Sequence, residues 1–233
     1  MDCSIRAVIF DIDDTLYDEM TFVQSGFRAV ARYLNMQYNL DKEEAYQEML
    51  SCLEKDGRGQ IFDSVLKSHG IHTSQLIEEL VETYRVHTPE ISLYPDVVET
   101  FKRLHAMELG TGIITDGLHT VQKRKVGALK LQDYVDFIIY TDELGPNYEK
   151  PHPASFLQAI RLLNLKPKNV LYVGNNPEKD ISGANSVGMQ SFHLCRGVYT
   201  CDGACNAGYH AKSLRALFNI ITLKPGGEGF ARI

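Results

Sequence analysis

Three carboxylates and a threonine follow directly after a short apolar run near the amino terminus. The run is Ala7–Phe10, and Asp11, Asp13, Asp14 and Thr15 come within the next five positions. The run has the length and branching of a buried parallel strand, and ligands of open α/β sheets bind beyond the carboxyl ends of such strands. Carboxylates on one side of an extended chain, with a carbonyl and waters, satisfy a hard cation such as Mg²⁺. A second interpretation stays open, a solvated acidic turn that caps a helix.

A second polar cluster follows a second apolar run. Thr115, Asp116 and Gly117 come directly after residues 112–114. The Thr115 hydroxyl and the backbone N–H groups of the next two residues stand at the start of a predicted helix, which is a ready anion site. These residues alone also fit a plain helix N-cap.

Two more polar segments complete the set of candidates. Lys150 stands in a loop with two prolines, which fix backbone angles and so fix where the ammonium points. By itself this lysine also fits an ordinary surface position. After a predicted strand, Gly174 permits a close backbone approach, and Asn175 with Asp180 can complete the oxygen shell of a cation.

The elements that must position these residues follow from the apolar spacing. Apolar residues recur at threes and fours after Leu16, which predicts helices over 19–36, 42–56, 61–69 and 74–86. From Leu93 the pattern predicts a helix opened by Pro95, strands at 109–114, 137–140, 169–173 and 190–194, and helices at 118–129, 153–163, 180–187 and 212–221.

This alternation predicts a parallel sheet with right-handed crossovers. We therefore expect an α/β fold, a doubly wound, Rossmann-like core. The expected core comprises residues 1–16 and 92–233, and a small all-helical cap domain of residues 17–91 interrupts it after the first strand.

Length and charge narrow the class of protein. A chain of 233 residues favours a core domain with a smaller accessory one. The net charge is −6 and the Lys and Arg residues are scattered, which argues against nucleic-acid binding and favours a small-molecule ligand. We find no stretch as long as a membrane span and no leader-like amino terminus, so we expect a cytoplasmic protein that binds neither nucleic acid nor membranes. The oligomeric state is not readable from the sequence.

The cysteines allow two interpretations. Their number, five, is odd and their spacing wide, so we expect reduced thiols rather than a disulfide framework. Cys195, Cys201 and Cys205, with His193 and His210, have a spacing that could assemble a zinc site. A Gly-rich loop without a Cys-x-x-Cys pair favours a metal-free segment, although the zinc interpretation stays open.

Taken together, the four polar clusters resemble the motifs of the haloacid dehalogenase superfamily. The match runs through Asp11-x-Asp13-x-Thr15, Thr115, Lys150 and the segment from Gly174 to Asp180. With the helical insert it covers nearly the whole chain. The insert after the first motif is similar to the cap of the branch that includes phosphoglycolate phosphatases, nucleotidases and the haloacid dehalogenases.

The resemblance implies a Mg²⁺-dependent phosphatase that acts on a small phosphorylated metabolite. Asp11 would be the nucleophile that forms an aspartyl-phosphate, and Asp13 the general acid and then base. Thr115, Lys150 and the backbone of Asp116 and Gly117 would hold the phosphoryl oxygens, and Thr15 would shape the turn. The expected metal ligands are Asp11, Asp13, Asn175 and Asp180.

Asp13 favours phosphatase over dehalogenase chemistry. Dehalogenases have a similar motif with a tyrosine at the position of Asp13. Their leaving group is a halide, which needs no proton, so they do not need a general acid there. Asn175 is a departure, since this branch usually carries aspartate there, and the amide brings no negative charge to the cation. Three explanations follow, namely a weakened but working site, a silent ligand-binding protein, or a deliberate substitution. The asparagine also lends slight support to a 2-haloacid dehalogenase.

Overall fold

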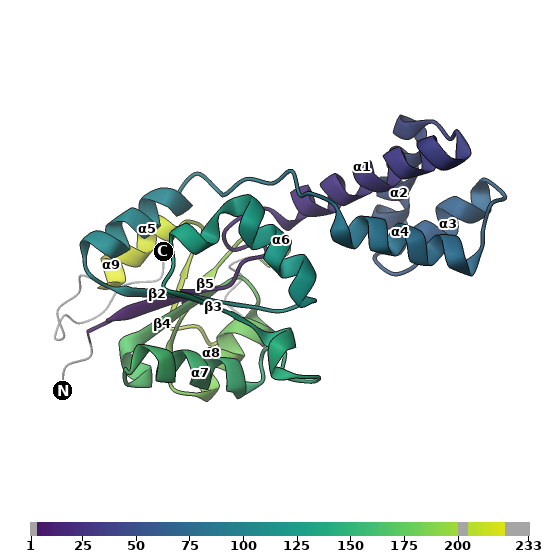
Figure 1. Ribbon diagram of the computed structural model, residues 1–233. Helices are drawn as coiled ribbons and strands as arrows, with labels where there is room; N and C mark the ends of the chain where they lie inside the picture. The colour runs from purple at the N-terminus through teal and green to yellow at the C-terminus, as the bar shows by residue number, and fades with distance from the viewer. Residues whose placement is uncertain (1–3, 200–204, 222–233) are drawn as a thin grey trace. The chain divides into compact units, whose positions relative to one another are not determined.

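The computed structural model describes residues 4–199 and 205–221 (Figure 1). The chain divides into two compact units. The first comprises Met1–Asp18, Ser92–Gln122 and Leu129–Ile233, and the second comprises Glu19–Ile91 and Lys123–Ala128. The first unit carries the parallel sheet, and the second is helical.

The first unit is built on a parallel sheet with the strand order β3-β2-β1-β4-β5-β6. The strands are β1 (Ala7–Phe10), β2 (Gly110–Thr115), β3 (Phe137–Tyr140), β4 (Val170–Gly174), β5 (Gln190–Leu194) and β6 (Tyr209–Ala211). Phe10 of β1 pairs with Ile113 on one side and with Val173 on the other. The carboxyl ends of these three strands therefore align. From β1 the strand order runs outward through β2 and β3 on one side and through β4, β5 and β6 on the other, so the topological switch point, where ligands of such sheets bind, lies between β1 and β4.

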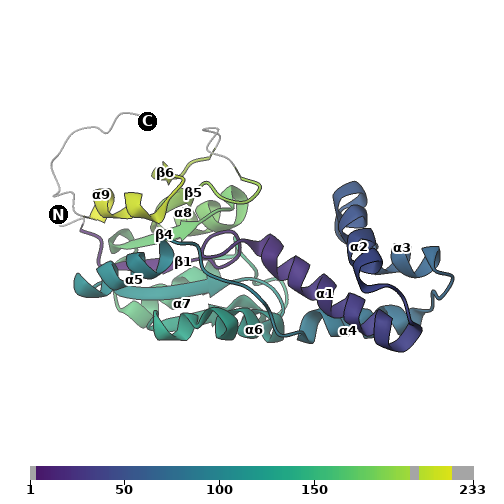
Figure 2. The same ribbon diagram turned by 90° about the horizontal axis from the view of Figure 1, so that it is seen from above.

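Helices cover both faces of this sheet, so the predicted doubly wound α/β fold is confirmed. Helices α5 (Val97–Ala106) and α9 (Leu217–Ile221) lie on one face, where Arg103 stacks on the Phe218 ring. Helices α7 (Pro153–Leu163) and α8 (Ser182–Ser186) lie on the other (Figure 1). Figure 2 shows the same core from above.

The interior of the core is apolar, with close approaches at glycine. Ile9, Phe156 and Tyr172 are fully buried in the cluster between β1, β4 and α7. A side chain at Gly112 would collide with the ring of Phe137 on the neighbouring strand. Burial of both faces explains why these strands read as continuous apolar runs.

The second unit contains four helices before its last segment. They are α1 (Glu19–Tyr38), α2 (Lys42–Asp56), α3 (Ile61–Ser68) and α4 (Ser74–Val86). Asp41 caps α2, because its carboxylate accepts from the N–H groups of Glu43 and Glu44 at 2.9 Å. Val30, Leu34, Met49, Leu66 and Leu80 are almost completely buried in the core of this unit.

Several predicted boundaries differ from the structure. The strand β6 was not predicted, because three residues carry too short a pattern. The predicted helix over 180–187 is a π-helical turn at Pro177–Ile181 followed by α8, and the last helix is a 3₁₀ turn at Leu214–Ala216 followed by α9. The glycine-rich segment 224–229 and Cys201 lie outside the described residues.

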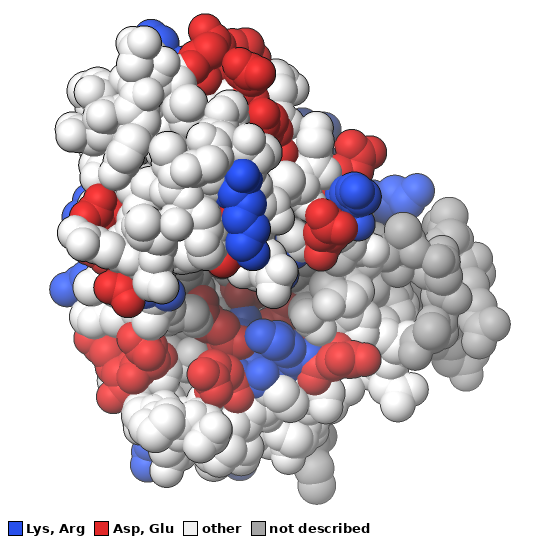
Figure 3. Space-filling view, turned by 90° about the vertical axis from the view of Figure 1, so that its right-hand side faces the viewer, with Lys and Arg blue, Asp and Glu red and all other residues white. Residues whose placement is uncertain are grey.

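The described residues include no helix that is long and apolar enough to cross a membrane. On the face drawn in Figure 3, Lys and Arg side chains are interspersed with Asp and Glu. This mixture agrees with the net charge of −6 and with the scatter of basic residues along the chain.

The core of the second unit gives a test with a matched control. Leu34 is fully buried and Met36, in the same helix, is 73% exposed. Leu34→Ala should lower the free energy of unfolding by about 2–5 kcal/mol, because it removes buried methyl groups and leaves a cavity. Met36→Ala should change it by less than about 0.5 kcal/mol. Denaturant unfolding measures both, and equal losses would contradict this packing.

Candidate active site

Asp11 lies at the carboxyl end of β1, where the sheet holds its backbone. Its N–H donates to the Val173 carbonyl at 2.9 Å, and only 6% of the residue is exposed. The chain then turns back, as the N–H groups of Thr15 and Leu16 both donate to the Ile12 carbonyl. This turn lets the Thr15 hydroxyl donate to Asp11 Oδ2 at 3.2 Å. The threonine thus orients the carboxylate.

Lys150 is the buried cation of the site. Its Nζ donates to Asp11 Oδ1 at 2.6 Å and to Asp180 Oδ1 at 2.7 Å, and 4% of the residue is exposed. The Tyr172 hydroxyl lies 3.2 Å from the same Nζ. A buried charge needs several polar partners, because removing an ion from water without them costs on the order of several kcal/mol.

Burial and neighbouring charges shift both pKa values of the Asp11–Lys150 pair. The pKa of Asp11 is raised to about 7, chiefly because the carboxyl is buried; Lys150 opposes this rise, and the Asp180 and Asp13 carboxylates add to it. Burial by itself would lower the pKa of Lys150, but Asp11 and Asp180 outweigh it and raise that pKa well above its ordinary value. Lys150 is therefore charged at neutral pH, and because this one ammonium faces two carboxylates, further positive charge beside Asp11 would be favourable.

Asp13 is held by two side chains that the sequence analysis did not single out. The Tyr17 hydroxyl donates to Asp13 Oδ1 at 2.5 Å, and the Gln122 amide donates to Asp13 Oδ2 at 3.0 Å. The same amide nitrogen lies 2.5 Å from the Thr115 hydroxyl oxygen. Gln122 thus joins the first acidic motif to the end of β2.

Asp116 and Gly117 follow Thr115 at that end. Asp116 Oδ1 accepts from the Thr141 hydroxyl at 2.9 Å and from the Lys150 backbone N–H at 3.0 Å, so this carboxylate holds the lysine loop in place. Gly117 has a φ of 109°, which lies in a region that favours glycine. A contact of this segment with an anion would therefore come from its backbone N–H groups.

Asp180 and Asn175 come from the segment after β4. Asp180 Oδ1 accepts from Lys150 and Tyr172, and its Oδ2 accepts from the Asn176 backbone N–H at 3.0 Å. Asn175 is 6% exposed, and its carbonyl lies 2.9 Å from His193 Nε2. A side chain at Gly174 would collide with the Asp180 carboxylate, so the glycine admits this arrangement.

The predicted site residues therefore meet at one edge of the sheet. Asp11, Lys150 and Asp180 are in direct contact, and Asp13 and Thr115 are linked through Gln122. Asn175 follows β4, which pairs with β1 in register. The oxygen atoms of Asp11, Asp13 and Asn175 are the donor type that Mg²⁺ prefers, so these residues fit that ion.

The sequence carried only weak signals for the supporting residues. Tyr17 lies four residues after Asp13, and Gln122 lies in the first turn of α6 (His119–Leu129). Tyr172 lies inside a strand that reads as plain apolar core. Their roles depend on which side chains face one another across segments distant in sequence.

Arg196 is a further supporting residue that sequence reasoning missed. Its Nη1 donates to the Thr15 carbonyl at 2.9 Å and its Nη2 donates to Asp96 Oδ2 at 2.5 Å. Asp96 also accepts from the Leu214 backbone N–H at 2.9 Å. Burial alone would raise the pKa of Asp96, but hydrogen bonds from Arg196 and Ser213 lower it below its usual range. This network ties the turn after Asp11 to the segment before α9.

Comparison with known families identifies the chain. Residues 8–194 match the family model described as haloacid dehalogenase-like hydrolase, which spans the first acidic motif through β5. The chain belongs to this family. The match covers all four polar clusters, so the resemblance drawn from them is confirmed, as is the prediction of a hydrolase of phosphatase type.

Several relatives are phosphatases by name. The chain is 32% identical to a glyceraldehyde 3-phosphate phosphatase of Methanopyrus kandleri over 84% of this chain and 86% of the relative. It is 32% identical to a protein of the same name from Methanocaldococcus jannaschii over 93% and 97% of the two chains. A solved HAD phosphatase from Thermococcus onnurineus is 28% identical, with a TM-score of 0.64 over 94% of this chain and 98% of that one.

Gly174 gives a test of the Asp180 arrangement. Gly174→Ala should lower the free energy of unfolding by about 1–3 kcal/mol, because the added methyl displaces a carboxylate pinned by Lys150, Tyr172 and Asn176. Gly127→Ala is the control, since nothing lies within 4 Å of a methyl there, and it should stabilise by about 0.5–1 kcal/mol. Thermal or denaturant unfolding compares them. A Gly174→Ala protein as stable as the parent would refute the close approach.

Proposed function

We propose that the protein is a Mg²⁺-dependent phosphomonoester hydrolase of a small phosphorylated metabolite, acting through an aspartyl-phosphate on Asp11. The observation that carries this proposal is the buried contact of Asp11 with Lys150, at 2.6 Å, at the carboxyl end of β1. A carboxylate with one oxygen fixed by Lys150 and the other by Thr15 is oriented for attack on phosphorus. The phosphatase names of the relatives support the same chemistry.

The proposed reaction has two steps with one acid–base group. An Asp11 oxygen attacks phosphorus, the bond to the leaving oxygen breaks, and Asp13 gives that oxygen its proton. Water then attacks the phosphorus of the aspartyl-phosphate, Asp13 takes the proton of this water, and phosphate leaves with Asp11 restored. The contacts of Asp13 with Tyr17 and Gln122 support this role, because they fix its carboxylate in one orientation.

The oxygens of the phosphoryl group that is transferred need hydrogen-bond donors. The Thr115 hydroxyl, the Lys150 ammonium and the backbone N–H groups of Asp116 and Gly117 are the proposed donors. Thr15 would contribute through the turn and through its hydrogen bond to Asp11. These groups stabilise charge as it moves onto the phosphoryl oxygens.

Asp11, Asp13 and Asn175 are the residues proposed to hold Mg²⁺. The ion would supply positive charge that lets two anions approach each other. The elevated pKa of Asp11, about 7, supports a cation there, because added positive charge favours the carboxylate form. Asp180 was expected to be a ligand; its contacts with Lys150 and Asn176 favour a role in positioning the lysine.

The helical unit is proposed to act as the cap. An element inserted directly after the catalytic motif can exclude water and select the substrate when it closes. Residues 17–91 were assigned to it from the sequence. The substrate class proposed from the relatives is a small sugar or triose phosphate.

The nucleophile can be tested with a matched substitution. Asp11→Asn should lower phosphate release from p-nitrophenyl phosphate by about 10³-fold or more, since the covalent route is lost. Asp133→Asn, at an exposed aspartate, should leave it unchanged. A panel that includes glyceraldehyde 3-phosphate, assayed with added Mg²⁺, extends the test to metabolites. Parent protein that releases no phosphate from any member of the panel would rule out the hydrolase.

Asn175 favours a second candidate, a silent protein that binds a phosphometabolite. Asn175→Asp should lower the Mg²⁺ concentration for half-maximal activity by about tenfold, because it adds one negative charge at the site. Asn219→Asp is the control, at an exposed asparagine of α9. Mg²⁺ titration of activity measures both. Thermal stabilisation of the parent by a phosphometabolite, with hydrolysis only in Asn175→Asp, would favour the silent protein instead.

A further inference from the structure

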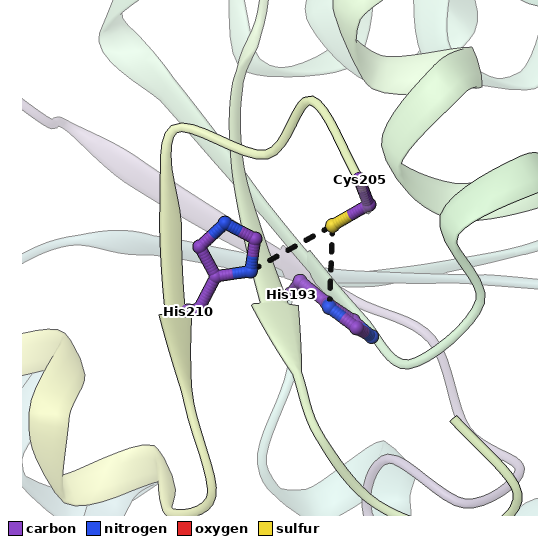
Figure 4. Close-up of side chains that lie close together, drawn as sticks. All are labelled: His193, Cys205 and His210. Atoms are coloured by element: carbon purple, nitrogen blue, oxygen red, sulfur yellow. Dashed lines mark hydrogen bonds between the residues drawn. The ribbon is translucent and has the colours of Figure 1, made fainter. Parts of the chain in front are cut away.

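Three side chains with metal-binding atoms converge near the carboxyl end of β5. His193, Cys205 and His210 each offer one ligand atom, and these atoms lie within 4.8 Å of one another. Figure 4 shows the two imidazoles on neighbouring strands and the thiol reaching toward both from the preceding loop. This cluster has no part in the reaction proposed above.

The sheet brings the two histidines together. β5 and β6 are parallel, and His193 pairs directly with His210. Paired residues of neighbouring strands project their side chains to the same face, and the two ring centroids lie 5.7 Å apart. The loop that leads into β6 returns Cys205 to this pair. Residues distant in sequence thus meet because of one strand pairing.

A hydrogen bond sets the orientation of the His193 ring. Its Nε2 lies 2.9 Å from the Asn175 carbonyl oxygen, which can only accept, so Nε2 carries the proton. His193 Nδ1 therefore presents a lone pair, and it faces Cys205 Sγ at 3.3 Å. Metal-binding histidines commonly donate their second N–H to a backbone carbonyl in this way.

The spacing of the ligand atoms fits a tetrahedral ion. Cys205 Sγ lies 3.3 Å from His193 Nδ1 and 3.7 Å from His210 Nδ1. Zinc bonds of about 2.3 Å to sulfur and about 2.0 Å to nitrogen, at tetrahedral angles, separate those atoms by about 3.5 Å. One metal ion can bind the thiolate and both imidazole nitrogens at the same time.

We propose that His193, Cys205 and His210 bind one Zn²⁺ ion, with water in the fourth position. The set of one thiolate and two imidazoles suits a borderline-soft ion and contains no carboxylate. It therefore differs in kind from the oxygen donors proposed for Mg²⁺. The ion would cross-link β6 to β5. Through the hydrogen bond of His193 it would also restrain the Asn175 backbone.

Cys195 is the neighbour that an experiment must separate from the three ligands. The expectation of reduced thiols is wrong at this position, since Cys195 is disulfide-bonded, while Cys52 and Cys205 are free cysteines. Cys195 Sγ lies 3.9 Å from His193 Nδ1. It lies beside the proposed ligands without being one of them, so the Cys195→Ser variant serves as a control.

The test uses the full chain, stripped of metal and kept reduced. Zn²⁺ binding is measured by equilibrium dialysis with elemental analysis, and Co²⁺ serves as a spectroscopic probe of sulfur ligation. We expect one equivalent of Zn²⁺ per chain, a sulfur-to-cobalt charge-transfer band, and a higher melting temperature with Zn²⁺, because the ion binds the folded state. None of these measurements depends on phosphatase activity.

Variants separate the proposed ligands from their neighbours. Cys205→Ser should abolish the charge-transfer band, and both it and His210→Asn should weaken Zn²⁺ binding by about 100-fold or more. His210 is exposed, so its variant should still fold. Cys52→Ser, at the free cysteine in the helical unit, and Cys195→Ser should both bind like the parent.

Two results would overturn the proposal. Parent protein that binds no more Zn²⁺ than Cys205→Ser would show that the cluster is a metal-free thiol–imidazole contact. Loss of Zn²⁺ binding in Cys195→Ser, with binding unchanged in Cys205→Ser, would show that Cys195 is the sulfur ligand and that the proposed role of Cys205 is wrong.

Discussion

The candidate active site of this protein depends on one buried interaction, the contact of Lys150 with Asp11 and Asp180. A single ammonium lies between two carboxylates, at 2.6 and 2.7 Å, where water is largely excluded. Each group would be costly to bury without the others. The lysine comes from the loop before α7, one aspartate ends β1, and the other follows β4. Their contact therefore fixes three segments of the chain in one place, and Asp116 adds a fourth by holding the lysine backbone.

The same interaction leaves an electrostatic imbalance. Asp11, Asp13 and Asp180 are three carboxylates, and Lys150 is the cation that contacts two of them. Burial with this excess of negative charge raises the pKa of Asp11 to about 7. A carboxylate in such a setting gains from added positive charge, which links the proposed Mg²⁺ to the proposed nucleophile. Asn175 reduces the attraction for that cation by one unit of charge relative to an aspartate.

Parallel strand pairing assembles both candidate sites. The register of β1 with β2 and β4 aligns the strand ends that carry Asp11, Thr115 and Asn175. The register of β5 with β6 places His193 against His210. The two sites meet at one hydrogen bond, between His193 Nε2 and the Asn175 carbonyl. A ligand at either site would therefore restrain the same segment after β4.

The sequence by itself determined the fold class and the family, and it predicted which positions would form the site. Apolar runs that end in Asp11, Thr115 and Gly174 predict parallel strands with polar ends, because helices cover such strands on both faces. The positions of the helices in the second unit also followed from the periodicity of their apolar residues. Only the tertiary structure decided which side chains touch. Tyr17, Gln122, Tyr172 and Arg196 act through contacts across distant segments, and β6 is too short to show a pattern. Local sequence encodes the period of an element, whereas the partner of a buried polar group depends on how the elements pack.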